Sequence, residues 1–243
     1  MTAHFPDLSE RGDAAIRVTA AALNPAMTPA QDGYVSHGTA RSGIYRNAAK
    51  RVFDVVIVLV SAPIVLPLVL MLALLVARDG GRAFYSQARV GRGGRIYTIW
   101  KLRSMVVNAE TKLEAHLAAD PAARAEWDST QKLKSDPRIT RFGRLLRKSS
   151  MDELPQLFNV LRGDMSLVGP RPMMPEQRSL YPGHAYYALR PGITGIWQVS
   201  ERNDSTFADR AGFDAQYDRD LSLATDLRLL MATVRVVLRA TGH

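Results

Sequence analysis

The sequence predicts a helix-dominated α+β protein in which a re-entrant membrane helix-break-helix precedes a small cytosolic domain with interfacial amphipathic helices and a short β-hairpin. Three observations predict this class: a long apolar run between Val52 and Ala77, helical segments with arginines along one side, and two short strand-like segments around a Gly/Arg turn. Such a run exceeds the about 20 residues that a membrane-spanning helix needs.

The chain divides into three parts. Residues 1–44 are rich in Ala, Thr, Pro and Gly without an apolar period, which predicts a disordered N-terminal tail. Asp7, Glu10 and Asp13 stand where a secretory signal needs a basic start and an apolar stretch, so this is no secretory signal. Residues 45–82 form the basic flank and membrane helix, and residues 83–243 form the cytosolic domain.

The apolar run is predicted to dip into the membrane and return. Pro63 and Pro67 near its middle each remove an amide donor, so we expect a break there, and Ser61 lies close by. Each half, of about 10–14 residues, is too short to cross the hydrocarbon alone. Basic residues, which prefer the cytoplasmic side, flank both ends: Arg46, Lys50, Arg51, Arg78 and Arg82. The alternative is an ordinary kinked transmembrane helix.

Charge and composition restrict the partners. Among 243 residues, 32 Lys and Arg face 23 Asp and Glu, a formal charge of +9 that favours anionic partners: nucleic acid, acidic lipid or phosphorylated substrates. The absence of cysteine excludes disulfides, thiolate nucleophiles and thiolate metal sites. No recognisable nucleic-acid-reading module accompanies the charge, and the apolar run has no place in such a protein, so we expect no nucleic-acid partner.

Two segments have arginines on one side and apolar residues on the other. In "DPRITRFGRLLRKSS" and "DLRLLMATVRVVLRATGH" the basic residues recur at helical spacing opposite an apolar face. Helices in the membrane interface fit this pattern, and for the second segment a core-packing helix fits equally. For the first segment the alternative is a solvated basic face, which does not explain why one sign of charge is so concentrated. "RAFYSQARVGRGGRIYTIWKLRSM" predicts the hairpin, and "NAETKLEAHLAADPAARAEW" predicts a charged helix ending near Pro121.

The stretch "RKSSMDELPQLFN" places Asp152 and Glu153 behind basic residues. Ser150 and Glu153 match a capping box, or Asp152 is the N-cap with Pro155 in the first turn. Against this purely structural role, a helix start beside arginines attracts phosphate. Carboxylates beside phosphate imply a divalent cation between them. One acid then faces phosphorus while the other holds metal.

Two loops carry further polar candidates. In "RGDMSLVGPRP", prolines on both sides fix the backbone that presents Arg171, which suits bidentate phosphate recognition. "LRPGITGIWQVSERN" is a second Gly/Pro elbow, whose polar candidates are Arg190, Gln198 and Arg202.

From residue 45 onward the chain resembles the bacterial polyprenol-phosphate sugar-1-phosphate transferases, and within them the short exopolysaccharide type. The motifs "IWKLRSM", "MDELPQLFNVLRGDMSLVGPRP" and "RPGITGIWQVSERN" carry the resemblance. It implies a cytosolic catalytic domain at the bacterial inner (cytoplasmic) membrane that transfers a sugar 1-phosphate, of galactose or glucose, from a UDP-sugar to undecaprenyl phosphate and releases UMP. Anionic lipids would be further partners, and homo-oligomerisation stays open.

The resemblance also implies roles for single residues. Asp152 would attack phosphorus and carry a covalent phosphosugar, Glu153 would bind Mg²⁺, and the expected substrate- or phosphate-binding residues are Arg171, Arg147, Lys101, Arg103, Asp164, Arg190, Gln198 and Arg202. The family's Ser-Pro helix break corresponds here to Leu66 and Pro67, so Ser61 and Pro63 would supply part of the break. Two alternatives remain: direct attack by the lipid phosphate with Asp152 as base, and a non-catalytic scaffold that binds anionic lipid.

Overall fold

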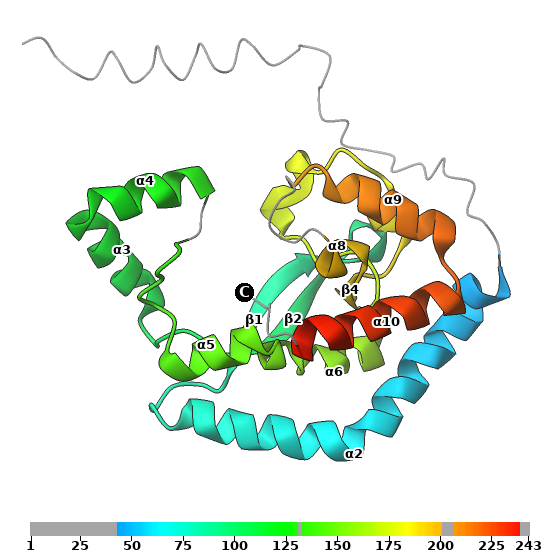
Figure 1. The fold of residues 1–243 in the computed structure, drawn as a ribbon, viewed down its shortest axis with the longest axis horizontal. Coiled ribbons are helices and arrows are strands. Elements are labelled where there is room, and N and C mark those ends of the chain that lie inside the picture. Colours follow the sequence, from blue (N-terminus) through cyan, green and yellow to red (C-terminus); the bar gives the residue numbers. More distant parts are fainter. Residues whose placement is uncertain (1–42, 131–132, 201–206, 239–243) are drawn as a thin grey trace, which may run out of the picture. The chain divides into compact units, whose positions relative to one another are not determined.

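The computed structural model describes residues 43–130, 133–200 and 207–238 (Figure 1), so the predicted tail lies almost entirely outside the described residues. Helices far outweigh strands among these residues, as predicted. In chain order the helical elements are η1 (Tyr45–Ala49), α2 (Lys50–Ala77), η2 (Arg92–Gly94), α3 (Ala109–Ala119), α4 (Pro121–Thr130), α5 (Arg141–Lys148), η3 (Met151–Glu153), α6 (Gln156–Arg162), η4 (Pro175–Leu180), α7 (Ala185–Ala188), α8 (Ile196–Val199), α9 (Arg210–Asp220) and α10 (Leu223–Leu238). The strands are β1 (Phe84–Val90), β2 (Ile96–Leu102), β3 (Ser166–Val168) and β4 (Gly192–Thr194).

The apolar run forms one continuous helix rather than two. α2 passes through both Pro63 and Pro67 and bends in its middle (Figure 1). Each proline leaves one carbonyl of the preceding turn without its amide partner, which permits a bend without ending the helix. Ser61 Oγ donates to the Val58 carbonyl at 3.0 Å beside the bend. The expected break is therefore a bend, and the return of the chain to the same membrane face stays a prediction.

The surface of this helix is apolar and exposed. Together with η1, it is the one helix among the described residues that is long and apolar enough to cross a membrane, and Ile64 is 76% exposed. A narrow face is covered: Leu72, Ala73 and Val76 pack with Leu102 of β2 and Leu146 of α5, and Asp54 and Val58 are buried nearer the start of the helix. Exposure of so much apolar surface indicates a lipid environment for the remainder.

The predicted hairpin is confirmed. β1 and β2 pair antiparallel from Phe84 opposite Leu102 to Val90 opposite Ile96. Gly93 and Gly94 in the connecting turn have φ values of 68° and 78°, a left-handed conformation that residues with a Cβ rarely adopt. A second, parallel pair joins β3 to β4.

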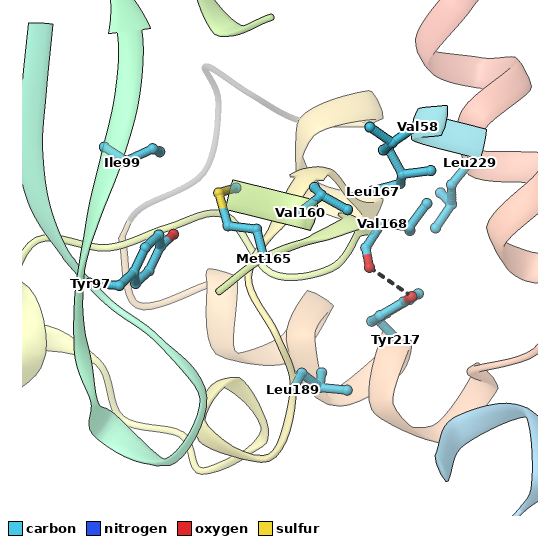
Figure 2. Packing of buried hydrophobic residues seen from close by; sticks show 10 residues of the cluster. All are labelled: Val58, Tyr97, Ile99, Val160, Met165, Leu167, Val168, Leu189, Tyr217 and Leu229. Carbon is cyan, nitrogen blue, oxygen red and sulfur yellow. Dashed lines mark hydrogen bonds between the residues drawn. The ribbon is translucent and has the colours of Figure 1, made fainter. Parts of the chain in front are cut away.

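A hydrophobic core joins the hairpin, α6, β3 and the C-terminal helices (Figure 2). Val160 of α6 and Val168 of β3 are fully buried at its centre, and Leu229 of α10 and Val58 of α2 close it. Tyr217 of α9 donates to the Val168 carbonyl at 3.1 Å, so the core also satisfies a polar group (Figure 2). This core fixes the platform on which the loops after β2 and β3 are held.

The predicted amphipathic segments form α5 and α10. Each buries one side and exposes apolar residues on the other: Leu146 and Leu229 are buried, whereas Leu145, Leu227, Met231 and Val234 are exposed. α10 therefore takes part in the core, and its exposed apolar residues leave the predicted interfacial role standing. The predicted charged helix is α3, which ends at Ala119, close to Pro121 as expected, and Pro121 begins a further helix, α4.

Candidate active site

A basic pocket of about 880 Å³ opens beside the β1–β2 hairpin. Tyr85, Gln87 and Arg89 alternate along β1, so they point to one face of the hairpin, and Lys101 lies opposite Tyr85 in the register. All four line the pocket. Its charged lining consists of six cations and three acids: Arg89, Lys101, Arg103, Arg138, Arg147, Arg171, Glu110, Asp152 and Glu153. The excess of positive charge suits an anionic ligand.

The two adjacent acids project from a tight turn between α5 and α6. α5 ends at Lys148, and Ser150 then adopts φ 56° and ψ 18°, the one left-handed non-glycine residue among those described. This conformation costs about 1–2 kcal/mol, and it reverses the chain into the single 3₁₀ turn η3, which holds Asp152 and Glu153. The turn thus positions both acids at the pocket.

Neither predicted cap is present. Ser150 makes no side-chain capping bond, and α6 begins after Pro155, also without one. The capping-box and N-cap predictions are therefore wrong, because the acids lie in their own 3₁₀ turn, and Leu154 and Pro155 follow before α6 begins at Gln156. The acids do not serve the helix end that the sequence suggested.

Asp152 is buried, with 8% of its surface exposed. Burial raises the pKa of its carboxyl to about 6, and neighbouring Glu153 adds to the rise, while Lys101 and Arg147 oppose it. At neutral pH the group is mainly a carboxylate held in a poorly hydrated place, which makes it reactive toward an electrophilic centre.

Glu153 forms an ion pair with Lys101, with Oε1 and Nζ 2.6 Å apart. Both side chains are about one-quarter exposed, so the pair stands at the pocket wall rather than in the core. Its neighbours connect the site with the apolar helix through a shared cluster: Met151 and Leu154, on either side of the acids, pack on the buried residues of α2, β2 and α5 that include Leu72, Leu102 and Leu146.

Two of the predicted phosphate-binding arginines face the pocket. Arg147, in the last turn of α5, donates from Nε to Ser104 Oγ at 2.8 Å. Arg171 follows Gly169, whose packing is so close that a Cβ there would lie 2.3 Å from the Arg190 carbonyl oxygen. The guanidinium of Arg171 lies 5.5 Å from the Trp197 ring centroid. Gln198 of α8 also lines the pocket.

Other predicted residues are placed differently. Arg103 lines the pocket, but its guanidinium binds Asp79 and the carbonyls of Val76, Arg82 and Met105, so it fastens the end of α2 to the hairpin. Asp164 lies by Arg162 and Asn159, and Arg190 donates from Nε to the Gly163 carbonyl at 3.0 Å. Neither is among the pocket residues. Arg202 lies outside the described residues.

Three basic residues near the pocket were not predicted from the sequence: Arg89, Arg138 and Arg210. Arg89 and Arg138 line it, and Arg210 stacks on Trp197 with its guanidinium carbon 4.2 Å from the ring centroid. The alternation of Tyr85, Gln87 and Arg89 in the strand was a usable signal for Arg89. No local pattern pointed to Arg210, because its role depends on how α9 packs against α8.

The chemistry of the donor set limits the metal that the site could take. No group of three or more His, Cys, Asp or Glu able to hold a metal occurs in the described part of the chain. Mg²⁺ needs only one or two carboxylates when substrate phosphates and waters supply the remaining ligands. Glu153 and Asp152 therefore fit a metal that shares its ligands with a phosphate, and do not form a self-sufficient metal site.

Comparison with known proteins agrees with this geometry. The family described as bacterial sugar transferase matches residues 45–240. The "UDP-galactose-lipid carrier transferase" of Erwinia amylovora and the "Undecaprenyl-phosphate galactose phosphotransferase" of Salmonella typhimurium are each 50% identical over 195 residues, which is 79% of this chain. The chain spans only 41% of the length of these two relatives.

A shorter relative is covered almost completely. The "Exopolysaccharide production protein ExoY" of Rhizobium meliloti is 43% identical over 197 residues, which cover 80% of this chain and 87% of that protein. The match includes the bent apolar helix, the turn with both acids and the loop of Arg171. The family match and the similarity to this relative together show that the chain belongs to the bacterial sugar transferase family.

Proposed function

We propose that this protein transfers a hexose 1-phosphate from a UDP-sugar to undecaprenyl phosphate, releasing UMP, as the first step of exopolysaccharide assembly. One observation carries the proposal: the turn with Asp152 and Glu153 faces a basic pocket while its flanking residues, Met151 and Leu154, pack on the buried cluster that joins the apolar helix to β2 and α5. An anionic, water-soluble substrate and a lipid-borne acceptor can meet at such a place. The names of the Erwinia amylovora and Salmonella typhimurium relatives support the same reaction.

In the first step the Asp152 carboxylate oxygen attacks the β-phosphorus of the UDP-sugar. A new oxygen–phosphorus bond forms as the bond to the bridging oxygen breaks, so UMP leaves with that oxygen and its electron pair. The product is a phosphosugar bound covalently to Asp152. Its low exposure supports this role, because a poorly hydrated carboxylate loses little solvation on attack.

In the second step a phosphate oxygen of undecaprenyl phosphate attacks the same phosphorus. The Asp152–phosphorus bond breaks, the carboxylate is regenerated, and a lipid-linked diphosphosugar leaves. Lys101, Arg147 and Arg171 are the cations that favour the anionic groups in both steps, since all three line the pocket with Asp152.

Mg²⁺ is the proposed cofactor. Glu153, with Asp152 beside it, would hold the ion together with substrate phosphate, and the bound ion would neutralise phosphate charge as the bridging bond breaks. Glu153 must then exchange its ion pair with Lys101 for the metal, which leaves Lys101 to donate to phosphate.

We further propose that the reaction takes place at the cytoplasmic face of the bacterial inner membrane, with the apolar helix as the membrane anchor. Arg51 holds the first turns of α2 to the end of α6 through the Val160 and Leu161 carbonyls, and Arg103 holds its last turn to the hairpin. Both ends of α2 are thus attached to the same domain. This supports the re-entrant topology, in which the domain stays on one side and contacts anionic lipid through its basic helices.

The assay is UMP release by purified protein in nanodiscs, from a panel of UDP-sugars that includes UDP-galactose and UDP-glucose. UMP should form stoichiometrically without lipid and catalytically with undecaprenyl phosphate, and only with Mg²⁺. Mass spectrometry of protein with UDP-sugar alone should show a phosphosugar on Asp152. Asp152→Asn should form neither product, and activity retained in that variant would exclude the covalent mechanism.

The same assay separates the alternatives. Direct attack by the lipid phosphate predicts catalytic turnover with no phosphosugar on the protein. A lipid-binding scaffold predicts no UMP at all, and function unchanged by Asp152→Asn and Glu153→Gln.

A further inference from the structure

Three arginines come together where β1, the loop after β3 and the start of α9 converge. The guanidinium carbons of Arg171 and Arg210 lie 5.5 and 4.2 Å from the Trp197 ring centroid. Arg210 also lies 4.6 Å from the Phe207 ring centroid. Arg89, on the pocket face of β1, lines the same pocket as Arg171. Burial and then the charge of Arg171 lower the pKa of Arg89. Burial, Arg171 and Arg89 likewise lower the pKa of Arg210, to about 10.

This arginine cluster has no anionic partner in the described part of the chain. None of the three guanidinium groups forms an ion pair with a described carboxylate. The Nε atoms of Arg89 and Arg210 are buried and have no hydrogen-bond partner. Asp214 is the acid that favours the charge of Arg210, but its Oδ2 accepts from Tyr181 at 2.8 Å. Arg89 Nη2 donates to Gln87 Oε1 at 2.6 Å, and Arg171 and Arg210 lie over aromatic rings, but none of these contacts supplies a negative charge. Burying cations without a counter-charge is unfavourable, so their arrangement suits a ligand that brings it.

The hairpin register separates the arginine cluster from the acid turn. Lys101, which pairs with Glu153, lies opposite Tyr85, whereas Arg89 lies opposite Tyr97, four residues further along the strand. At about 3.3 Å per residue this is about 13 Å along one pocket wall. The pocket therefore has two basic parts, one at the acids and one beyond them.

An in-line displacement needs such an arrangement. The attacking and leaving oxygens lie on opposite sides of the phosphorus, so a group expelled by Asp152 must sit further from the acid turn than the phosphorus itself. Figure 1 also shows α8 and α9 on the side of the hairpin opposite to the C-terminal half of α2. A soluble nucleotide reaches that side more directly than a lipid phosphate held at the helix.

We propose that Arg89, Arg171 and Arg210 form the subsite for the nucleoside monophosphate half of the donor, and hold the UMP phosphate as it leaves. The name of the nucleotide rests on the proposed function, whereas the phosphate site itself rests on the arginine cluster. Arg89 and Arg210 are therefore substrate-binding residues that act on leaving-group affinity rather than on the attack by Asp152.

Binding of UMP tests the subsite without any turnover. Isothermal titration calorimetry on the full chain in nanodiscs would compare UMP, uridine and inorganic phosphate for wild type, Arg89→Gln, Arg210→Gln and the charge-preserving Arg89→Lys. Arg124→Gln, at an exposed arginine of α4 outside the pocket, is the matched control. We expect UMP affinity to fall at least tenfold in both glutamine variants, to fall less in Arg89→Lys, and to stay unchanged in the control. The preference for UMP over uridine should shrink in parallel.

Three results would overturn the subsite or its assignment. UMP affinity within twofold of wild type in both glutamine variants rejects the subsite, and so does an equal loss of uridine and UMP binding. A raised KM for undecaprenyl phosphate with unchanged UMP affinity assigns the cluster to the lipid phosphate instead. Thermal unfolding of each variant shows whether it is folded, and Arg89→Lys keeps the test decisive if a glutamine variant is not.

The proposed function fails separately. If wild type releases no UMP from any UDP-sugar while UMP binding still depends on the arginines, the reaction is wrong and the phosphate site stands. If the protein releases UMP from a UDP-sugar but its affinity for UMP is unchanged in both arginine variants, the reaction stands and the subsite is wrong.

Discussion

Replacing Asp152 with asparagine should stabilise the folded protein while it abolishes sugar-phosphate transfer. The reason is the burial of the carboxyl, which raises its pKa from 3.8 to about 6. Between these two values the folded protein holds a proton that the unfolded chain has released. The unfolding free energy of wild type therefore falls as pH rises through this window and is constant above it.

The size of the effect follows from the same two values. The burial of the ionised group costs about 3 kcal/mol at pH 8 and about 1.6 kcal/mol at pH 5, from the linkage relation. Asparagine avoids this cost, although imperfect hydrogen bonding of its amide takes back about 1 kcal/mol. The expected net gain is about 2 kcal/mol at pH 8, or roughly 4–8 °C in Tm for a chain of this length, and it shrinks by about 1.4 kcal/mol at pH 5.

Thermal unfolding in nanodiscs at pH 5 and pH 8 measures both numbers. The matched control is Asp128→Asn, at a carboxylate on α4 that is 62% exposed, and its effect should be small at both pH values. An Asp152→Asn protein that is no more stable than wild type at pH 8 would refute the argument. So would a gain that is the same at pH 5, because the stabilisation would then have no connection with the charge.

Three other changes test the site and its support. UMP formation in single turnover without lipid should fall about tenfold per pH unit below about pH 6, because only ionised Asp152 attacks; a flat profile from pH 5 to 8 contradicts this. Asp226→Asn should lower the unfolding free energy by about 3–5 kcal/mol, since fully buried Asp226 pairs with a lysine and accepts hydrogen bonds from two tyrosines. Asp218→Asn, in a partly exposed ion pair, should lower it by about 1 kcal/mol or less, and chemical denaturation measures both variants. Gly143→Ala should lower the unfolding free energy by about 2 kcal/mol or more and reduce transfer, because its Cβ would lie 1.9 Å from the Ser104 carbonyl oxygen and displace Ser104, the partner of Arg147. The control is Gly212→Ala in α9, which has open space around it and should be neutral or stabilising. Equal effects at the two glycines would contradict the close packing at Gly143.

Local patterns were enough to predict several parts of the fold. The hairpin followed from strand-like residues around glycines that favour positive φ, and the basic helix α5 from its 3.6-residue period. The pairing of Asp152 and Glu153 with a basic pocket followed from the arginines just upstream in the chain. In each case the decisive neighbours are close in sequence.

Roles that depend on distant contacts could not be predicted in this way. Arg103 looked like Lys101, two residues before it, yet Arg103 binds Asp79 at the end of α2 while Lys101 pairs with Glu153. The cap predictions failed for a related reason: the left-handed Ser150 starts a separate turn whose Met151 and Leu154 pack on a cluster of residues from α2, β2 and α5, and no capping rule contains such distant contacts. Arg210 needed the packing of α9 against Trp197 before it could be connected with the pocket.

The charges at the acid turn also explain why a cation should accompany the substrate. Lys101 and Arg147 lower the pKa of Asp152, against the burial that raises it, and so keep the group mainly ionised near neutral pH. A diphosphate that binds these same cations screens their positive charge from Asp152 and adds negative charge beside it. Both effects favour the protonated, unreactive carboxyl. A divalent cation held by Glu153 would oppose both effects, because it would supply positive charge beside the diphosphate. In the proposed mechanism the adjacent acids would then have separate and dependent roles: Glu153 would keep Asp152 ionised in the presence of the phosphate that Asp152 attacks.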